Sequence, residues 1–240
     1  MIFISLPATE NMINRLLDAL IESNDGHVAS LAVGAFDDCR EAQRPPVVSV
    51  CCSDSRVSQE GMWMVDRPGF LFTAGNIGNR VRTVVDGEPV LSGSVAYPIG
   101  HADTDVLAIV GHTGCGAVGA ALAAVRTGEY PPEPGVRADV EALVPIVEAG
   151  LNHPAIDEEA PTGTIHDPLV EYNVHEQVAF ACDRPETGDA EVYGFVYDFH
   201  RSYGDSDGTA YLVNADGERH PARIREIVAD EHVDHVATLL

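Results

Sequence analysis

The sequence contains no lysine, so its 14 basic residues are all arginine, and they face 38 acidic residues. The formal net charge of -24 produces a surface that repels nucleic acid and anionic membranes, and we expect neither as a partner. We interpret the carboxylates as a solvated acidic surface of the kind found in halophilic proteins. Such a surface keeps a protein soluble where salt screens the repulsion between like charges.

Long apolar runs are also absent. No stretch approaches the length of a membrane-spanning helix, and the first seven residues lack the basic region and cleavage site of a signal peptide. Cysteine is scarce, and an odd count of five favours free thiols or metal binding over a disulfide framework. We therefore expect a cytoplasmic protein.

Helix and strand patterns alternate along the 240 residues, which suffice for one large α/β domain. Apolar residues at helical spacing predict helices over 11–22, 27–41, 92–101, 115–125, 137–151 and 168–182. Continuous apolar runs predict strands over 47–51, 105–111 and 192–197, with an edge strand at 210–213. This alternation is typical of an α/β fold with a mainly parallel central β-sheet, an antiparallel edge strand and flanking helices.

Two cysteines and a histidine follow the two best strand patterns. Cys52 comes directly after 47–51, while His112 and Cys115 follow 105–111 at a His-x-x-Cys spacing. Ligands of open parallel sheets bind outside the carboxyl ends of the strands, so we expect these side chains to meet there. Two thiolates and one imidazole suit zinc better than magnesium or calcium, and they leave a fourth position open. Cys51 points to the opposite side of its strand and is expected in the core.

Asp54 and Arg56 lie two and four residues after Cys52. In most contexts such a pair is an ordinary surface salt bridge, which contributes little stability. Beside a metal, a planar guanidinium can hold the carboxylate aside and leave room for a water molecule on zinc. Zinc-bound water ionises near neutral pH, so the sequence predicts a reaction through zinc-bound hydroxide.

The segments Cys52–Arg56 and His112–Gly116 resemble the two signature motifs of β-class carbonic anhydrases, the zinc enzymes that interconvert carbon dioxide and bicarbonate. Residues 43–46 resemble the Gln-x-x-Pro of the plant-like branch. Other segments extend the resemblance in family order as far as Asp198: 68–72, 76–79, 94–97, 172–178 and 194–198.

This resemblance implies one zinc ion per chain, bound by Cys52, His112 and Cys115 with water as the fourth ligand. It also implies that Asp54 accepts a hydrogen bond from that water and helps to move its proton, while Arg56 orients Asp54. By the same matching, five further residues surround the carbon dioxide position: Gln43, Phe72, Ile77, Tyr97 and Gly116, the last through its backbone.

Members of this family are dimers or larger, with N-terminal helices that embrace the neighbouring subunit, which implies a homodimer or higher homo-oligomer. The two N-terminal helical patterns could equally be ordinary packing helices. Because no repeat or linker interrupts the sequence, we predict a single domain over 1–240. It comprises an N-terminal helical arm (1–42), a zinc-binding α/β core (43–200), and a C-terminal edge strand and helix (201–240).

Some features depart from the family pattern. Gly75 stands where the family usually has arginine, and together with Gln43 this favours a zinc site that Asp54 does not close. We interpret residues 152–167 as an acidic, solvated insertion. Five histidines are interpreted as surface or helix-capping residues rather than proton shuttles: His101, His153, His166, His175 and His200.

Three other functions remain open at this point. The same site could hydrolyse carbon disulfide or carbonyl sulfide, which pocket access would decide. A non-catalytic zinc protein with a closed site is also possible, and Asp54 is then the candidate fourth ligand. A redox role for Cys51 and Cys52 is weaker, because adjacent cysteines lack the Cys-x-x-Cys spacing.

The acidic surface leads to the first testable prediction. Added salt screens the repulsion among the carboxylates, so thermal unfolding, followed by circular dichroism, is expected to shift upward between low and high salt. Each kcal/mol of added stability raises the Tm of a chain of this size by about 2–4 °C, and we expect a rise of several degrees. A Tm that stays constant or falls would contradict this interpretation.

Overall fold

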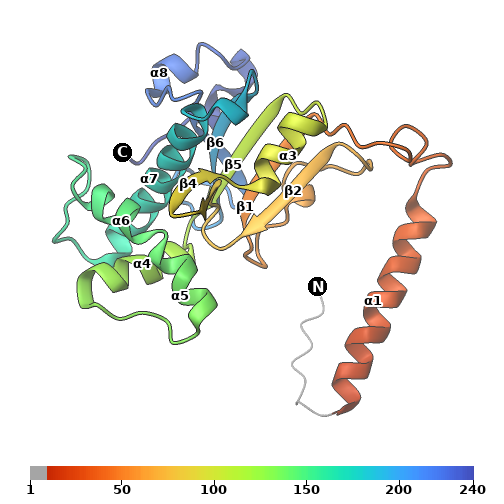
Figure 1. Cartoon of the computed structure of the whole chain (residues 1–240), viewed down its shortest axis with the longest axis horizontal. Helices are drawn as coiled ribbons and strands as arrows, with labels where there is room; N and C mark the ends of the chain where they lie inside the picture. Colours follow the sequence, from red (N-terminus) through yellow and green to blue (C-terminus); the bar gives the residue numbers. More distant parts are fainter. Residues whose placement is uncertain (1–9) are drawn as a thin grey trace. The chain divides into compact units, whose positions relative to one another are not determined.

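The structure is a computed structural model that describes residues 10–240. It divides into two compact units, which meet at the peptide bond between Glu41 and Ala42. The first unit contains one long helix, α1 (Glu10–Ser30), and the second contains the β-sheet and the remaining helices (Figure 1). None of the helices in 10–240 has the length and apolarity that crossing a bilayer requires.

The prediction of a second N-terminal helix over 27–41 is wrong. The first helix continues to Ser30, and residues 33–39 form turns instead. Gly34 adopts a φ of +78°, in the left-handed region where a right-handed helix cannot continue. The amide of Asp37 donates to the carbonyl of Gly34 across 2.9 Å, which closes one of these turns.

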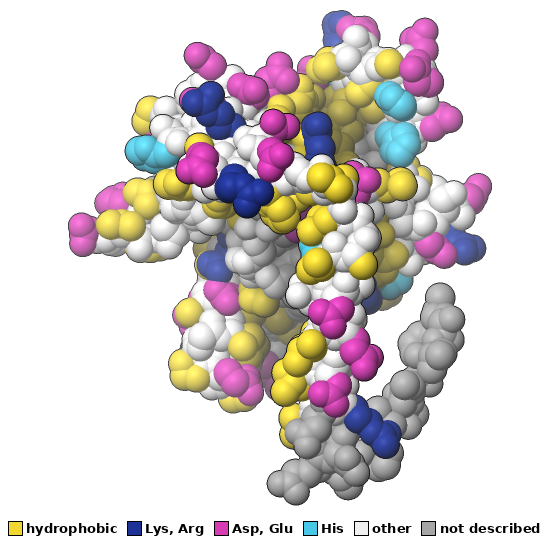
Figure 2. Space-filling view, turned by 90° about the vertical axis from the view of Figure 1, so that its right-hand side faces the viewer, with side chains coloured by type: hydrophobic (Ala, Val, Ile, Leu, Met, Phe, Trp, Pro, Cys, Tyr) yellow, Lys and Arg dark blue, Asp and Glu magenta, His cyan; other side chains and the backbone are white. Residues whose placement is uncertain are grey.

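The first unit exposes an apolar face. Hydrophobic side chains lie along one side of α1 and acidic side chains along another (Figure 2). Four apolar residues at helical spacing are each more than half exposed: Leu16, Leu17, Leu20 and Ile21. An apolar stripe of this kind normally faces a core or a partner.

The central sheet has the order β2-β1-β5-β6-β7, and all its neighbouring pairs are parallel except the last. The edge strand β7 runs antiparallel to β6. This arrangement confirms the predicted fold class. The strand bounds are β1 (Val47–Cys52), β2 (Leu71–Asn76), β5 (Val106–His112), β6 (Glu191–Asp198) and β7 (Thr209–Ala215).

Alternate residues of the inner strands face two different clusters. Val50 and Ile109 point into the main core, which packs against α3 (Gly93–His101), α4 (Gly116–Thr127), α6 (Val144–Leu151) and α7 (Thr162–Cys182). Figure 1 shows α4, α5 (Pro134–Glu141) and α6 grouped beside α7. On the opposite face, Cys51 packs with Val110 in a smaller cluster, as predicted for that cysteine. Short helical segments lie on this side: α2 (Gln59–Met62), α8 (Pro221–Ile224) and η2 (Asp230–His235).

Several other predictions need correction. The helix predicted over 137–151 is two helices, α5 and α6, and Pro145 lies in the first turn of the second, where its missing N–H costs nothing. The helix predicted from Pro168 begins six residues earlier, at Thr162. The predicted C-terminal helix is only the single turn of α8 and a 3₁₀ segment.

A β-hairpin is among the elements that the sequence patterns did not predict, as is the short helix α2. The strands β3 (Arg82–Val85) and β4 (Glu88–Leu91) form an antiparallel hairpin outside the central sheet. Asp86 and Gly87 connect them with φ angles of 52° and 86°. Asp-Gly is the sequence signal for such a two-residue turn, so this hairpin was predictable.

Candidate metal centre

Three predicted ligands meet at the carboxyl ends of β1 and β5. Cys52 ends β1, His112 ends β5, and Cys115 caps the N-terminus of α4. All three are buried, with exposed fractions of 8%, 0% and 1%. Their ligand atoms lie within 4.8 Å of one another, and the two sulfurs are 3.9 Å apart. Because β1 and β5 pair side by side in parallel, this convergence follows from the sheet register.

The turn between His112 and Cys115 contains a glycine with a positive φ and is bonded to a neighbouring strand. Gly114 takes a φ of +67°, which glycine adopts without strain. The amide of Thr113 donates to the carbonyl of Tyr197 across 3.1 Å, which ties the turn to the end of β6. The chain therefore reverses direction within two residues and returns Cys115 toward Cys52.

The tautomer of His112 follows from its neighbours. Its Nδ1 lies 3.0 Å from the carbonyl oxygen of Thr113, and a carbonyl only accepts, so Nδ1 carries the proton. The Nε2 atom is then a lone-pair donor. It is buried and has no hydrogen-bond partner among the described residues. A buried ring nitrogen with a free lone pair and an anchored opposite nitrogen is what a metal ligand requires.

The two sulfurs compete for one proton. The pKa of Cys52 is lowered to about 4, chiefly because Cys115 donates to its sulfur, with His112 and the backbone of Gly78 adding to the effect against the cost of burial. The pKa of Cys115 is raised, because its proton is held by the Cys52 thiolate and because it is buried. A divalent cation would balance both thiolates, and this set of soft sulfur and imidazole donors fits zinc.

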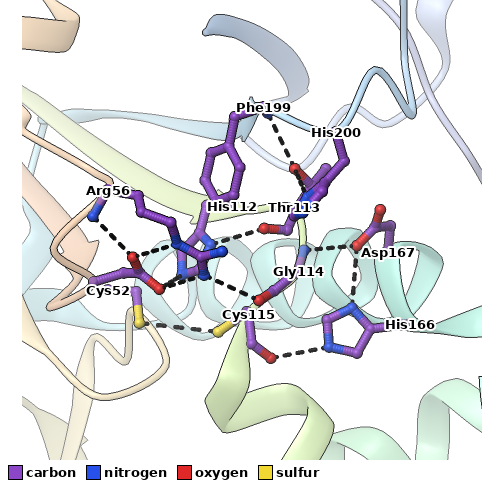
Figure 3. A network of polar contacts seen from close by, with 11 residues as sticks. Cys52, Arg56, His112, Thr113, Gly114, Cys115, His166, Asp167, Phe199 and His200 are labelled. Carbon is purple, nitrogen blue, oxygen red and sulfur yellow. Dashed lines mark hydrogen bonds and ion pairs between the residues drawn. The ribbon is translucent and has the colours of Figure 1, made fainter. Parts of the chain in front are cut away.

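Asp54 and Arg56 form a bidentate ion pair beside these ligands, and Figure 3 shows the Arg56 side of it. The guanidinium donates to both carboxylate oxygens, at 2.9 and 2.7 Å, and the Arg56 amide donates at 2.9 Å. Donation from Arg56 holds the pKa of Asp54 well below its usual range, although partial burial opposes the shift. An oxygen of Asp54 lies 3.7 Å from Nε2 of His112, so an ionised carboxylate stands at the edge of the metal site.

Comparison with known proteins identifies the family. The family model described as carbonic anhydrase matches residues 47–203. The chain belongs to the carbonic anhydrase family. Among the curated relatives, a carbonic anhydrase of Pseudomonas aeruginosa is 30% identical over 68% of this chain and 73% of its own length. Carbonic anhydrase 2 of Mycobacterium tuberculosis is 33% identical over 52% of each chain, so the match spans about half of that relative.

Solved structures show the same fold. The β-carbonic anhydrase CcaA has a TM-score of 0.66 at 21% identity, over 78% of this chain and 84% of that chain. A Coccomyxa β-carbonic anhydrase, solved in complex with acetazolamide, has a TM-score of 0.63 at 22% identity, over 90% of this chain and 98% of that chain. The chain therefore has the fold of the β-class enzymes.

Two of the predicted substrate-binding residues lie at the same end of the sheet as the metal ligands. Ile77 directly follows the end of β2, whose last residue is level with Cys52. Gly116 is the first residue of α4, and apart from its chain neighbours and the backbone of its own helix, no described atom lies within 4 Å of the position that a Cβ there would take. A small molecule at the metal site could approach the backbone of Gly116.

The other three predicted substrate-binding residues lie elsewhere in this carbonic anhydrase chain. Gln43 precedes β1, and Phe72 is level with Val48, four residues before Cys52, which is about 13 Å along the strand. The ring of Tyr97, on α3, lies 6.3 Å from the ring of Phe72. A single chain therefore does not bring Gln43, Phe72 and Tyr97 to its own metal ligands.

Two of the histidine interpretations are wrong. His166 is not a surface residue, because its side chain is 16% exposed and its Nε2 lies 2.9 Å from the carbonyl oxygen of Cys115. His175 is buried and contacts Asn214. The neighbouring Asp167 also contacts the metal-ligand turn, because it accepts the amide hydrogen of Gly114. The sequence did not indicate the contact of His166 or that of Asp167, because it predicted a helix start at Pro168, after both residues, whereas α7 begins at Thr162.

Replacing one ligand tests the site. Cys115→Ala leaves two donors, too few to hold zinc, so the metal content of protein purified with zinc is expected to fall from about one equivalent to near zero. Elemental mass spectrometry measures it. Cys51→Ala is the matched control, since this cysteine lies in β1 beside the ligand Cys52 but faces the opposite cluster, and the variant should retain its zinc. A full equivalent of zinc in Cys115→Ala would refute this ligand set.

Proposed function

We propose that this chain is a zinc-dependent carbonic anhydrase that hydrates carbon dioxide reversibly to bicarbonate and a proton. The proposal rests mainly on one observation: Cys52, His112 and Cys115 converge beside an ionised Asp54. Membership of the carbonic anhydrase family supports the same reaction.

Each residue has a role in this proposal. Cys52, His112 and Cys115 hold one zinc ion, which supplies the Lewis acidity that lets a water molecule ionise near neutral pH. Asp54 accepts a hydrogen bond from the attacking water and orients it toward the substrate. The amide of Gly116, at the N-terminus of α4, donates to the oxygen on which negative charge develops.

Arg56 keeps Asp54 in place. Its two charge-assisted hydrogen bonds occupy both carboxylate oxygens, and breaking them would leave a guanidinium without its partner. Its cation also lies over the ring of Phe199, 4.6 Å from the centroid, and that ring stacks on His112. These contacts support a site whose fourth position stays open, rather than one that Asp54 closes.

We also propose that a second copy of the chain completes the substrate pocket. Gln43, Phe72 and Tyr97 lie toward the end of the sheet away from their own metal ligands, so only another chain can bring such residues to this site. The exposed apolar stripe of α1 supports a homodimer or larger homo-oligomer. A related β-carbonic anhydrase pair from Sordaria macrospora, 19% identical, is tetrameric.

Asp54→Asn tests the catalytic carboxylate. The variant keeps the three zinc ligands but loses an ionised acceptor, so its zinc content is expected to match the parent while carbon dioxide hydration falls about a hundredfold or more. Because the Asp54 pKa lies below its usual range, the carboxylate stays ionised into mildly acidic solution, and the loss should appear across the whole neutral range. Stopped-flow hydration assays measure it.

The control is Asp207→Asn, since Asp207 forms a similar bidentate ion pair with Arg201 on the surface. Both carboxylate oxygens of Asp207 lie 2.9 Å from guanidinium nitrogens of Arg201. This variant should keep the parent rate. An Asp54→Asn enzyme that is fully active at every pH would show that the carboxylate takes no part.

Mixing two inactive variants tests the shared pocket. In this proposal Tyr97 contributes to the substrate pocket of the partner chain, so Tyr97→Ala inactivates the partner's site. Asp54 acts in the site of its own chain, so Asp54→Asn inactivates that site. In a mixed dimer one site has all its native residues, so co-refolding the two variants in equal amounts should restore about a quarter of the parent activity. If the two roles belonged to one chain, mixing would restore nothing.

A further inference from the structure

The first turns of α7 pack against the metal-ligand turn. Residues 162–167 were interpreted from the sequence as part of a solvated acidic loop, but they are helical. His166 and Asp167 point from this helix toward Gly114 and Cys115 (Figure 3). The proposed reaction uses neither of these two side chains.

Asp167 is hydrogen-bonded to Gly114, the residue of the turn whose backbone is freest to rotate. Its Oδ1 accepts the amide hydrogen of Gly114 at 2.9 Å, and its Oδ2 accepts the hydroxyl of Ser202 at 2.6 Å. Gly114 is the residue with the positive φ, so this bond fixes the peptide whose rotation would swing Cys115 away. The Asp167 side chain is only 18% exposed, which limits competition from water.

His166 holds the peptide that follows Cys115. Its Nε2 lies 2.9 Å from the carbonyl oxygen of Cys115 and its Nδ1 lies 3.1 Å from Asp167. Both of these oxygens accept, so the ring donates from both nitrogens. Gly119 leaves room for it, since a side chain there would place its first carbon 3.2 Å from Nε2. The carboxylate and the ring therefore anchor the two peptides that flank the Gly114–Cys115 peptide, one on each side.

A third contact secures this part of α7. Arg126, in the last turn of α4, donates to the hydroxyl of Thr162 at 2.9 Å and to the carbonyls of Glu158 and Ala160 at 2.6 and 3.0 Å. The two ends of α4 are thus tied to the segment 158–167, one through Arg126 and the other through Cys115. Residues 158–167 therefore pack against α4 beside the metal site instead of forming a solvated loop.

We propose that His166 and Asp167 are positioning residues that hold the Gly114–Cys115 backbone so that the sulfur of Cys115 stays aligned with Cys52 and His112 for zinc. This inference rests on the zinc site proposed above. Partners of this kind orient metal ligands without touching the metal, and their loss weakens metal binding by about ten- to a hundredfold.

Zinc affinity and a spectroscopic probe test the proposal together. For Asp167→Asn and His166→Gln we expect the zinc dissociation constant, measured by chelator competition at fixed pH, to rise about ten- to a hundredfold. The visible spectrum of the cobalt(II)-substituted protein, which reports ligand geometry, should differ from the parent spectrum in both variants. A role in folding alone would leave that spectrum unchanged.

Two matched substitutions serve as controls. Asp183→Asn removes an 82% exposed carboxylate just beyond the other end of α7. His153→Gln changes a histidine that lies before α7 and contacts the backbone of Ala155 and the ring of Tyr172 rather than the metal turn. Both should keep the parent affinity and spectrum.

Parent affinity and an unchanged cobalt spectrum in both test variants would overturn the proposal. If a test variant does not fold, Ser202→Ala removes only the second partner of Asp167 and should weaken zinc binding to a smaller degree, and parent affinity there would also overturn it. A parent protein that binds zinc but does not hydrate carbon dioxide would reject the proposed function, while the affinity comparison would still decide the role of His166 and Asp167.

Discussion

Parallel pairing of β1 with β5 is the constraint on which the rest of the site depends. It brings the ends of two strands side by side, and with them two sulfurs and one ring nitrogen in a buried space. Two neighbouring thiolates cannot both ionise there without a cation, and a hydrogen bond to the Thr113 carbonyl leaves the free lone pair of His112 facing inward. The fold and the chemistry of these donors therefore suit the same ligand, a divalent metal such as zinc.

Around this centre, polar groups of the turn have partners from three other parts of the fold. Arg56 follows β1, Tyr197 belongs to β6, and His166 and Asp167 come from α7. The turn itself is short and contains a glycine, so it has little rigidity of its own. Its geometry is set by its surroundings, which explains how a flexible loop can present a ligand in a fixed direction.

The sequence alone predicted the fold class and the convergence of Cys52, His112 and Cys115, because strand ends in a parallel sheet meet at one edge. It did not predict the contacts of His166 and Asp167, since Asp167 and Gly114 are 53 residues apart in the chain. In addition, Pro168 is a residue typical of the first turn of a helix, although here it lies inside α7. Nor could local patterns place Phe72 relative to Cys52, because strand register is a property of the assembled sheet. The missed hairpin at Asp86 had a recognisable turn signal, whereas the turns after Ser30 depend on the backbone conformation of Gly34.

We propose that two sulfurs and one imidazole hold a zinc ion with one position left for solvent. X-ray absorption spectroscopy at the zinc edge, on the purified holoprotein, tests it most directly. We expect two sulfur neighbours at about 2.3 Å with one nitrogen and one oxygen at about 2.0–2.1 Å. A shell with fewer than two sulfurs, or one filled entirely by protein sulfur and nitrogen, would contradict it.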